Sequence, residues 1–208
     1  MYFKQIPIGG YDNNLIYLFG ASKDEVAVVD PVEIPKLLEI ANTEGIGKIS
    51  AVFITHSHQD HIAGTPELLE TVGEIPVYIH ESGINELKVP CTGISDGDVV
   101  RVCGVGVKVH HTPGHRFDSV CYEVEENLVT GDTLFVDGCG RCDLPGSDVE
   151  AQYESLHVKL AALAPSLKVW PGHDYGSTKS STLEKEFANN PYLTVGSKAD
   201  FINLRIND

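Results

Sequence analysis

The stretch Thr55-His56-Ser57-His58-Gln59-Asp60-His61 constrains this chain more than any other part of its sequence. It places three imidazoles and a carboxylate side by side, and such a density of nitrogen and oxygen donors indicates a metal site. The preceding run 49–54 is apolar and rich in β-branched residues, so it predicts a buried strand. Thr65-Pro66 then starts a predicted helix. A polar loop held between a strand and a helix keeps its side chains in fixed positions.

Hydrophobic periodicity predicts the remaining elements of the fold. Strands are expected over residues 1–8, 15–19, 26–29, 49–54, 75–80, 99–102, 105–110, 120–124, 128–130 and 167–170, and helices over 35–44, from 65 onward, over 148–163 and over 182–188. Many strands come in hairpins with a few helices between them, which predicts two packed sheets with helices outside. With 208 residues and 42% hydrophobic content, the chain is long enough to bury one core, so 1–208 is expected to be a single domain.

The acidic composition argues against several classes of partner. The chain has 15 Lys and Arg against 30 Asp and Glu, a formal net charge of −15, which opposes attraction to nucleic acid or to anionic lipid. No run approaches the ~20 apolar residues that span a bilayer. Five cysteines, an odd number, favour reduced thiols over a disulfide framework. These features predict a cytoplasmic protein that binds neither nucleic acid nor membrane, and they do not indicate its oligomeric state.

Three more candidate ligands lie at predicted strand ends: His115 in Thr112-Pro113-Gly114-His115, Asp132 in Gly131-Asp132-Thr133, and His173 in Pro171-Gly172-His173-Asp174-Tyr175. Each follows a glycine turn, where the backbone can come close to a crowded centre. Taken alone, each is explained equally well as a surface or turn residue. Added to the motif at 55–61, they make five histidines and two aspartates, enough for two neighbouring metals that share a carboxylate.

The order of these motifs resembles the metallo-β-lactamase superfamily over nearly the whole chain. That resemblance implies an α+β fold, an αββα sandwich of two mixed sheets with helices on both outer faces. It assigns His56, His58 and His115 to a first metal, Asp60, His61 and His173 to a second, and makes Asp132 the bridge. The resemblance implies two divalent metal ions, with zinc as the favoured metal and iron or manganese also compatible with these ligands. The other histidines, His80, His110, His111 and His157, match no ligand position and are interpreted as structural or exposed.

Several stretches are similar to glyoxalase II, the hydroxyacylglutathione hydrolases: Val29-Asp30-Pro31, the motif at 55–61, Gly131-Asp132-Thr133-Leu134-Phe135 and Gly138-Cys139-Gly140-Arg141. The resemblance implies hydrolysis of a small-molecule thioester such as S-lactoylglutathione by a metal-bound hydroxide that Asp60 orients. It also implies that Arg141 and Tyr175 contact the substrate. Arg141 is explained equally well by a surface salt bridge.

Two features leave alternatives open. Classical glyoxalase II continues into a C-terminal helical domain that binds glutathione, whereas this chain stops soon after 189–193 and resembles short, single-domain relatives. Residues 138–143 also resemble persulfide dioxygenases, which use one iron on the counterparts of His56 or His58, His115 and Asp132. A hydrolase of lactones or phosphodiesters, or a metal-dependent regulatory protein, is a further alternative. Cys139 and Cys142 form a single C-x-x-C whose role the sequence does not indicate.

Overall fold

Two six-stranded sheets form the centre of the molecule in the computed structural model, which describes residues 1–207. The first sheet runs in chain order: β1 (Tyr2–Gly9), β2 (Asn14–Gly20), β3 (Glu25–Val29), β4 (Lys48–Phe53), β5 (Val77–His80) and β6 (Thr92–Ile94). Strands β1 to β3 pair antiparallel, and β3 to β6 pair parallel. This sheet is therefore mixed, as the sequence predicts.

The second sheet has the order β14 (Ser181–Thr182), β13 (Lys168–Pro171), β10 (Asn127–Gly131), β9 (Val120–Val124), β8 (Val105–His111) and β7 (Val99–Val102). Only β10 and β13 pair parallel, and the other neighbours are antiparallel. A short hairpin of β11 (Leu134–Phe135) and β12 (Gly138–Cys139) stands apart from it.

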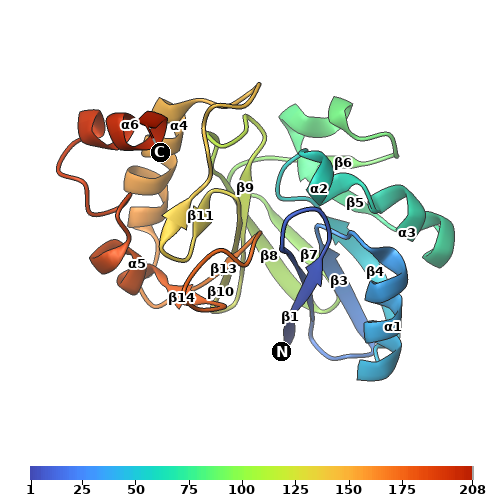
Figure 1. Cartoon of the computed structure of the whole chain (residues 1–208). Coiled ribbons are helices and arrows are strands. Elements are labelled where there is room, and N and C mark those ends of the chain that lie inside the picture. The colour runs from blue at the N-terminus through green and yellow to red at the C-terminus, as the bar shows by residue number, and fades with distance from the viewer. Residues whose placement is uncertain (208) are drawn as a thin grey trace.

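Helices cover the outer faces of both sheets (Figure 1). On the first sheet lie α1 (Ile34–Glu44), α2 (Gln59–Ile62) and α3 (Thr65–Val72), and on the second lie α4 (Val149–Glu154), α5 (Leu183–Asn189) and α6 (Lys198–Asn207). A 3-10 turn at Glu81–Glu86 follows β5. The resulting layers, helix, sheet, sheet, helix, are the predicted αββα sandwich.

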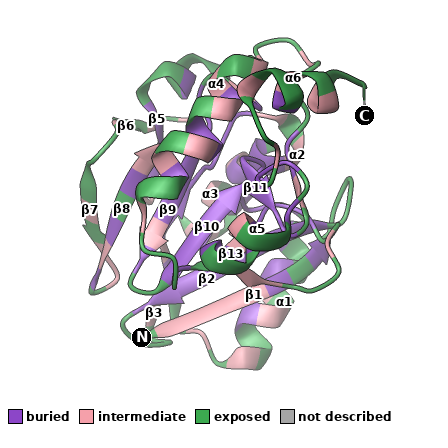
Figure 2. Ribbon diagram, turned by 90° about the vertical axis from the view of Figure 1, so that its left-hand side faces the viewer, coloured by how far each residue is buried: buried purple, intermediate pink, exposed green. Residues whose placement is uncertain are grey.

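Strand alternation explains the three apolar layers. In β2, Leu15, Tyr17 and Phe19 pack between the two sheets, whereas Ile16 and Leu18 pack under the helices of the first sheet. Every residue of β2 is buried, because the strand has a covered layer on each side (Figure 2). A third apolar cluster joins the second sheet to α4, α5 and α6. Burial of both sheet faces is what makes the apolar strand runs readable in the sequence.

The structure differs from the sequence prediction in several places, among them the short strands β11, β12 and β14, which were not predicted. The helix predicted over 148–163 is α-helical only to Glu154, then passes through a π-helical stretch, Ser155–Lys159, and a 3-10 turn, Leu160–Ala162. Edge strand β6 was not predicted, because three residues carry little periodicity. Helix α6 was also missed, and it depends on tertiary packing of Phe201 against Tyr153 and Tyr192. Among residues 1–207, no helix is long and apolar enough to cross a membrane.

The fully buried Phe201 is expected to fix α6 to the second sheet. Phe201→Ala should lower the free energy of unfolding by about 3 kcal/mol, the range for truncating a buried phenylalanine. Ile206→Ala, on the same helix but 66% exposed, should change it by less than about 0.5 kcal/mol. Denaturant titration of the metal-free protein measures both, and equally small effects would contradict a packed α6.

Candidate metal centre

Loops from both sheets bring all seven predicted ligands together. The loop after β4 and helix α2 carry His56, His58, Asp60 and His61, while loops after β8, β10 and β13 carry His115, Asp132 and His173. Their donor atoms form three overlapping groups, each within 4.8 Å: His56, His58 and His115; His56, His61 and Asp132; and Asp60, His61 and His173.

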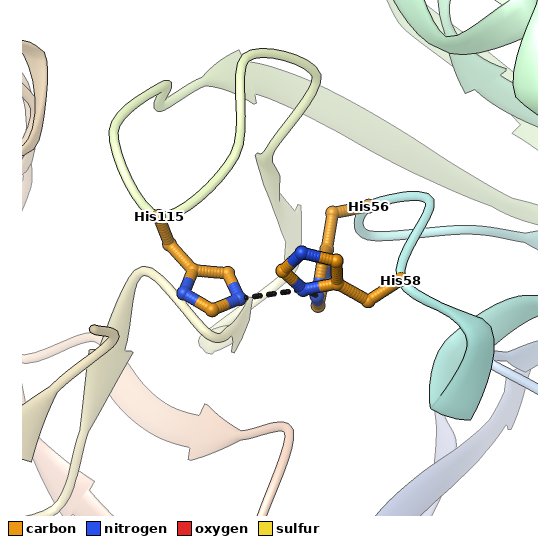
Figure 3. Close-up of side chains that lie close together, drawn as sticks. All are labelled: His56, His58 and His115. Atoms are coloured by element: carbon orange, nitrogen blue, oxygen red, sulfur yellow. Dashed lines mark hydrogen bonds between the residues drawn. The ribbon is translucent and has the colours of Figure 1, made fainter. Parts of the chain in front are cut away.

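The group of His56, His58 and His115, called the first group from here on, consists of three imidazoles that face one another (Figure 3). His58 Nδ1 lies 3.0 Å from His56 Nε2 and 2.9 Å from His115 Nε2. Zinc binds nitrogen at about 2.0–2.1 Å, so tetrahedral donors stand about 3.3 Å apart. The three nitrogens therefore have nearly the spacing that one tetrahedral ion requires.

The group of Asp60, His61 and His173, called the second group from here on, combines a carboxylate with two imidazoles. Asp60 Oδ2 lies 3.4 Å from His61 Nε2 and 3.3 Å from His173 Nε2, and the two imidazole nitrogens are 3.2 Å apart. His61 and His173 are buried, whereas the Asp60 side chain is 26% exposed. The group is thus closed on the protein side and open towards solvent at Asp60.

Asp132 stands between the two groups. Its Oδ2 lies 3.5 Å from His115 Nε2 and 3.2 Å from His173 Nε2, and its Oδ1 lies 3.5 Å from His61 Nε2. The carboxylate is buried, yet Oδ1 has no hydrogen-bond partner among residues 1–207. A buried carboxylate oxygen without a partner is costly unless a cation satisfies it. The donor set therefore fits two divalent metals that share Asp132.

Two glycines allow the loops to approach Asp132 this closely. A Cβ on Gly140 would lie 2.0 Å from the Asp132 carbonyl oxygen and 2.8 Å from His115 Nδ1, and one on Gly172 would lie 2.3 Å from Asp132 Oδ1. No side chain can be accommodated at these distances. The glycines beside the predicted ligands are thus required by packing around the centre.

The second ring nitrogen of four of the five histidines is held by the protein, which fixes the direction of each of these rings. His61 Nδ1 lies 2.9 Å from Asp30 Oδ2, and His56 Nδ1 lies 3.1 Å from Thr55 Oγ1. Backbone carbonyls hold the other two rings: His115 Nδ1 lies 2.8 Å from the Arg141 carbonyl, and His173 Nδ1 lies 2.6 Å from the Asp12 carbonyl. Asp30 also accepts hydrogen bonds from the Thr55 amide and hydroxyl, at 2.7 and 2.6 Å. A carbonyl or carboxylate partner leaves the other nitrogen free to bind a cation.

Sequence reasoning missed three supporting residues: Asp12, Asp30 and Asn14, whose side-chain amide donates to Asp60 Oδ2 at 3.2 Å. The signal for Asp30 was present, since Asp30-Pro31 follows a buried strand as Asp132 does. Asp12 lies in the turn between β1 and β2 and Asn14 is the first residue of β2, so both are far from the ligands in sequence and reach the site only in the folded chain.

The two groups hold protons differently in the absence of metal. Burial opposes charge on His173, but its hydrogen bonds to Asp132 and Asp60 outweigh burial and raise its pKa to about 10. The pKa of His61 is raised in the same way, against burial, by Asp132 and Asp30. In the first group, burial and the neighbouring His115 lower the pKa of His58 to about 4. The second group therefore carries protons at neutral pH that the first group lacks.

The predicted substrate contacts lie beside the centre. The guanidinium of Arg141 makes a two-point salt bridge to Asp143, with both contacts at 2.6 Å, on the exposed surface. Tyr175 is half exposed, stacks on His173 with ring centroids 4.8 Å apart, and donates its hydroxyl to the Asp12 carboxylate. Contact of either residue with a substrate stays a prediction.

The other histidines lie outside the seven-residue cluster. His80 stacks on His111, His110 pairs with Glu123, and His157 contacts the Tyr192 carbonyl. These contacts agree with the interpretation that they are structural or exposed.

Comparison with known proteins gives a consistent family. A model of the Metallo-beta-lactamase superfamily matches residues 9–173. The chain is 31% identical to a probable polyketide biosynthesis zinc-dependent hydrolase, BaeB, of Bacillus velezensis, over 93% of this chain and 87% of that protein. It is 39% identical to a hydroxyacylglutathione hydrolase of Francisella philomiragia, over 71% of this chain but only 58% of that protein.

Two solved structures illustrate the shared fold. ETHE1 from Myxococcus xanthus superposes with a TM-score of 0.89 at 29% identity, covering 100% of this chain and 91% of that one. TTHA1623, solved in a di-iron-bound form, gives 0.78 at 28% identity, covering 93% and 100%.

The difference in protonation predicts a difference in proton release on metal uptake. At about pH 7.5, filling the second group should displace at least one proton, because the pKa of His173 is about 10. Filling the first group should displace no proton from His58, whose pKa is about 4. Affinity of the second group should therefore rise with pH towards 10, while that of the first stays nearly flat. Calorimetry of the metal-free protein in buffers of different ionisation enthalpy measures this, and equal release from both groups would contradict it.

Proposed function

The chain belongs to the metallo-beta-lactamase superfamily, and from this premise we propose that it is a metal-dependent hydrolase of thioesters. The observation that carries the proposal is the pair of donor groups joined by the buried Asp132, with Asp60 on the open side. A two-metal centre of this kind suits attack of water on an acyl carbon. The similarity to a zinc-dependent hydrolase and to hydroxyacylglutathione hydrolases supports the same reaction class.

In this proposal His56, His58 and His115 hold one ion, Asp60, His61 and His173 hold the other, and Asp132 contacts both. Zinc is the first candidate, and iron or manganese fits the same donors. Such ions, when bound, supply hydroxide at neutral pH and polarise a carbonyl group.

Asp60 is the proposed catalytic residue of the chain. Its Oδ2 is held by His61, His173 and the Asn14 amide, so the carboxylate is directed before a substrate arrives. From that position it accepts a hydrogen bond from the attacking water and orients it towards the acyl carbon. The leaving thiol has a pKa near 8.5 and departs as thiolate, so no general acid is required.

The proposed substrate is an S-acylglutathione such as S-lactoylglutathione. Support comes from the hydroxyacylglutathione hydrolase relative, of which this chain spans 58%. Arg141 and Tyr175 are the proposed contacts to its thiol half. In the free protein the Arg141 guanidinium donates two hydrogen bonds to the Asp143 carboxylate. A substrate carboxylate would replace Asp143 in that two-point contact.

A persulfide dioxygenase is the second candidate, favoured by the similarity to ETHE1 over the whole chain. It would use one iron on His56 or His58, His115 and Asp132. A hydrolase of lactones or phosphodiesters on the same fold is a third.

The decisive comparison uses protein purified without added metal. We expect two ions per chain and release of thiol from S-lactoylglutathione, with slower turnover of lactone and phosphodiester substrates. One iron per chain together with oxygen uptake on glutathione persulfide would overturn the hydrolase proposal in favour of the dioxygenase.

Asp60→Asn should reduce kcat for thioester hydrolysis by about 100-fold or more, since it removes the carboxylate that orients the water. Asp98→Asn is the matched control, because Asp98 caps an exposed turn at Ser95. Steady-state kinetics measures both variants, and a kcat for Asp60→Asn within about threefold of the wild type would refute the assigned role.

Arg141→Gln should raise KM for S-lactoylglutathione by about 10-fold or more while kcat changes little, as expected for loss of a charge-assisted hydrogen bond. Arg101→Gln, exposed on β7, serves as the control. If KM does not move, Arg141 is a surface ion pair with Asp143 and does not contact the substrate.

A further inference from the structure

The turn between β1 and β2 is tied to the loop that carries His173. The amide of Leu15 donates to the Gly172 carbonyl at 2.8 Å, and the amide of Asp174 donates to the Asn13 carbonyl at 3.0 Å. Asn14 and His173 form an isolated antiparallel bridge. In Figure 1 this turn, in dark blue, reaches towards α2, which bears Asp60 and His61. The first hairpin of the chain thus lies against the second donor group.

The side chain of Asn14 connects this turn to Asp60. Its Nδ2 donates to the Asp60 main-chain carbonyl at 3.1 Å and to Asp60 Oδ2 at 3.2 Å, while its Oδ1 accepts from the Asp12 amide at 3.2 Å. Only a donor can satisfy the carbonyl of Asp60, and only an acceptor can satisfy the amide of Asp12. The amide orientation is therefore fixed, and Asn14 is buried at 2% exposure.

The oxygen that Asn14 holds is the one that faces the second group. Asp60 Oδ2 lies 3.4 Å from His61 Nε2 and 3.3 Å from His173 Nε2. The same turn fixes His173, whose Nδ1 bonds the Asp12 carbonyl at 2.6 Å. Two of the three donors of the second group are therefore directed by residues 12–14.

The first group is supported from elsewhere. His56 Nδ1 lies beside Thr55 Oγ1, and His115 Nδ1 bonds the Arg141 carbonyl. Neither contact involves the turn at 12–14. The hairpin turn and the first group are thus separate in their hydrogen bonding.

We propose that Asn14 is a positioning residue that sets the metal affinity of the second group independently of the first. The inference rests on the two-metal function proposed above and adds the residue that controls occupancy of one half of it. Removing a residue that orients a ligand typically costs 10- to 100-fold in metal affinity. The loss here should fall on the second ion alone.

The test compares Asn14→Leu and Asn14→Ala with Asn127→Leu. Leucine keeps the branched shape of asparagine and removes both polar ends. Asn127 is an equally buried asparagine that bonds Trp170 Nε1 at 2.9 Å, in the second sheet and away from the cluster. Zinc is titrated into the metal-free proteins, and bound zinc per chain is counted by elemental analysis.

Both Asn14 variants should bind the second zinc about 10- to 100-fold more weakly, with the first within about twofold of the wild type. Asn127→Leu should bind both as the wild type does, although it is less stable. Unchanged second-site affinity in both Asn14 variants would overturn the inference, and so would an equal loss at both sites. A wild-type chain that takes up one zinc would instead contradict the proposed two-metal function and this inference with it.

Discussion

A buried carboxylate among imidazoles is the interaction on which the rest of the site depends. Asp132 lies within 3.5 Å of His115 and 3.2 Å of His173, and one of its oxygens has no hydrogen-bond partner in residues 1–207. Removing an ion from water costs several kcal/mol unless opposite charge compensates it. Protons on His61 and His173 supply that charge in the metal-free protein, and metal ions would supply it in the loaded one. Asp132 and its surrounding histidines therefore require one another.

The sandwich meets this requirement because both sheets contribute to one edge. The loop after β4 comes from the first sheet, and the three loops with His115, Asp132 and His173 come from the second. The second sheet also forms hydrogen bonds to the loop after β4. The amide of Val120 donates to the Thr55 carbonyl at 2.9 Å, and the Tyr122 hydroxyl donates to the Ile54 carbonyl at 2.6 Å. A shift of one sheet against the other would separate the donor groups, so packing of the inter-sheet core maintains the geometry of the site.

The parts of this arrangement that follow from sequence are those with a local signature. Apolar runs identified most strands, and the unusual residue types at 56–61 identified the donor cluster. The contacts that direct the donors join residues far apart, such as Asn14 to Asp60 and Asp12 to His173, and no local pattern encodes them. Helix α6 escaped prediction for the same reason, since Phe201 packs on Tyr153 and Tyr192 from other segments. The Arg141–Asp143 pair, two residues apart, was readable from sequence as the alternative to a substrate contact.

The central claim is that the seven residues hold two ions with Asp132 between them, and anomalous X-ray diffraction from crystals of the metal-loaded protein tests it most directly. We predict two anomalous peaks about 3.5–4 Å apart. One should lie about 2.0–2.2 Å from donors of His56, His58 and His115, and the other at the same distance from donors of Asp60, His61 and His173. A single peak, or a pair in which either ion lacks contact with Asp132, would contradict the account.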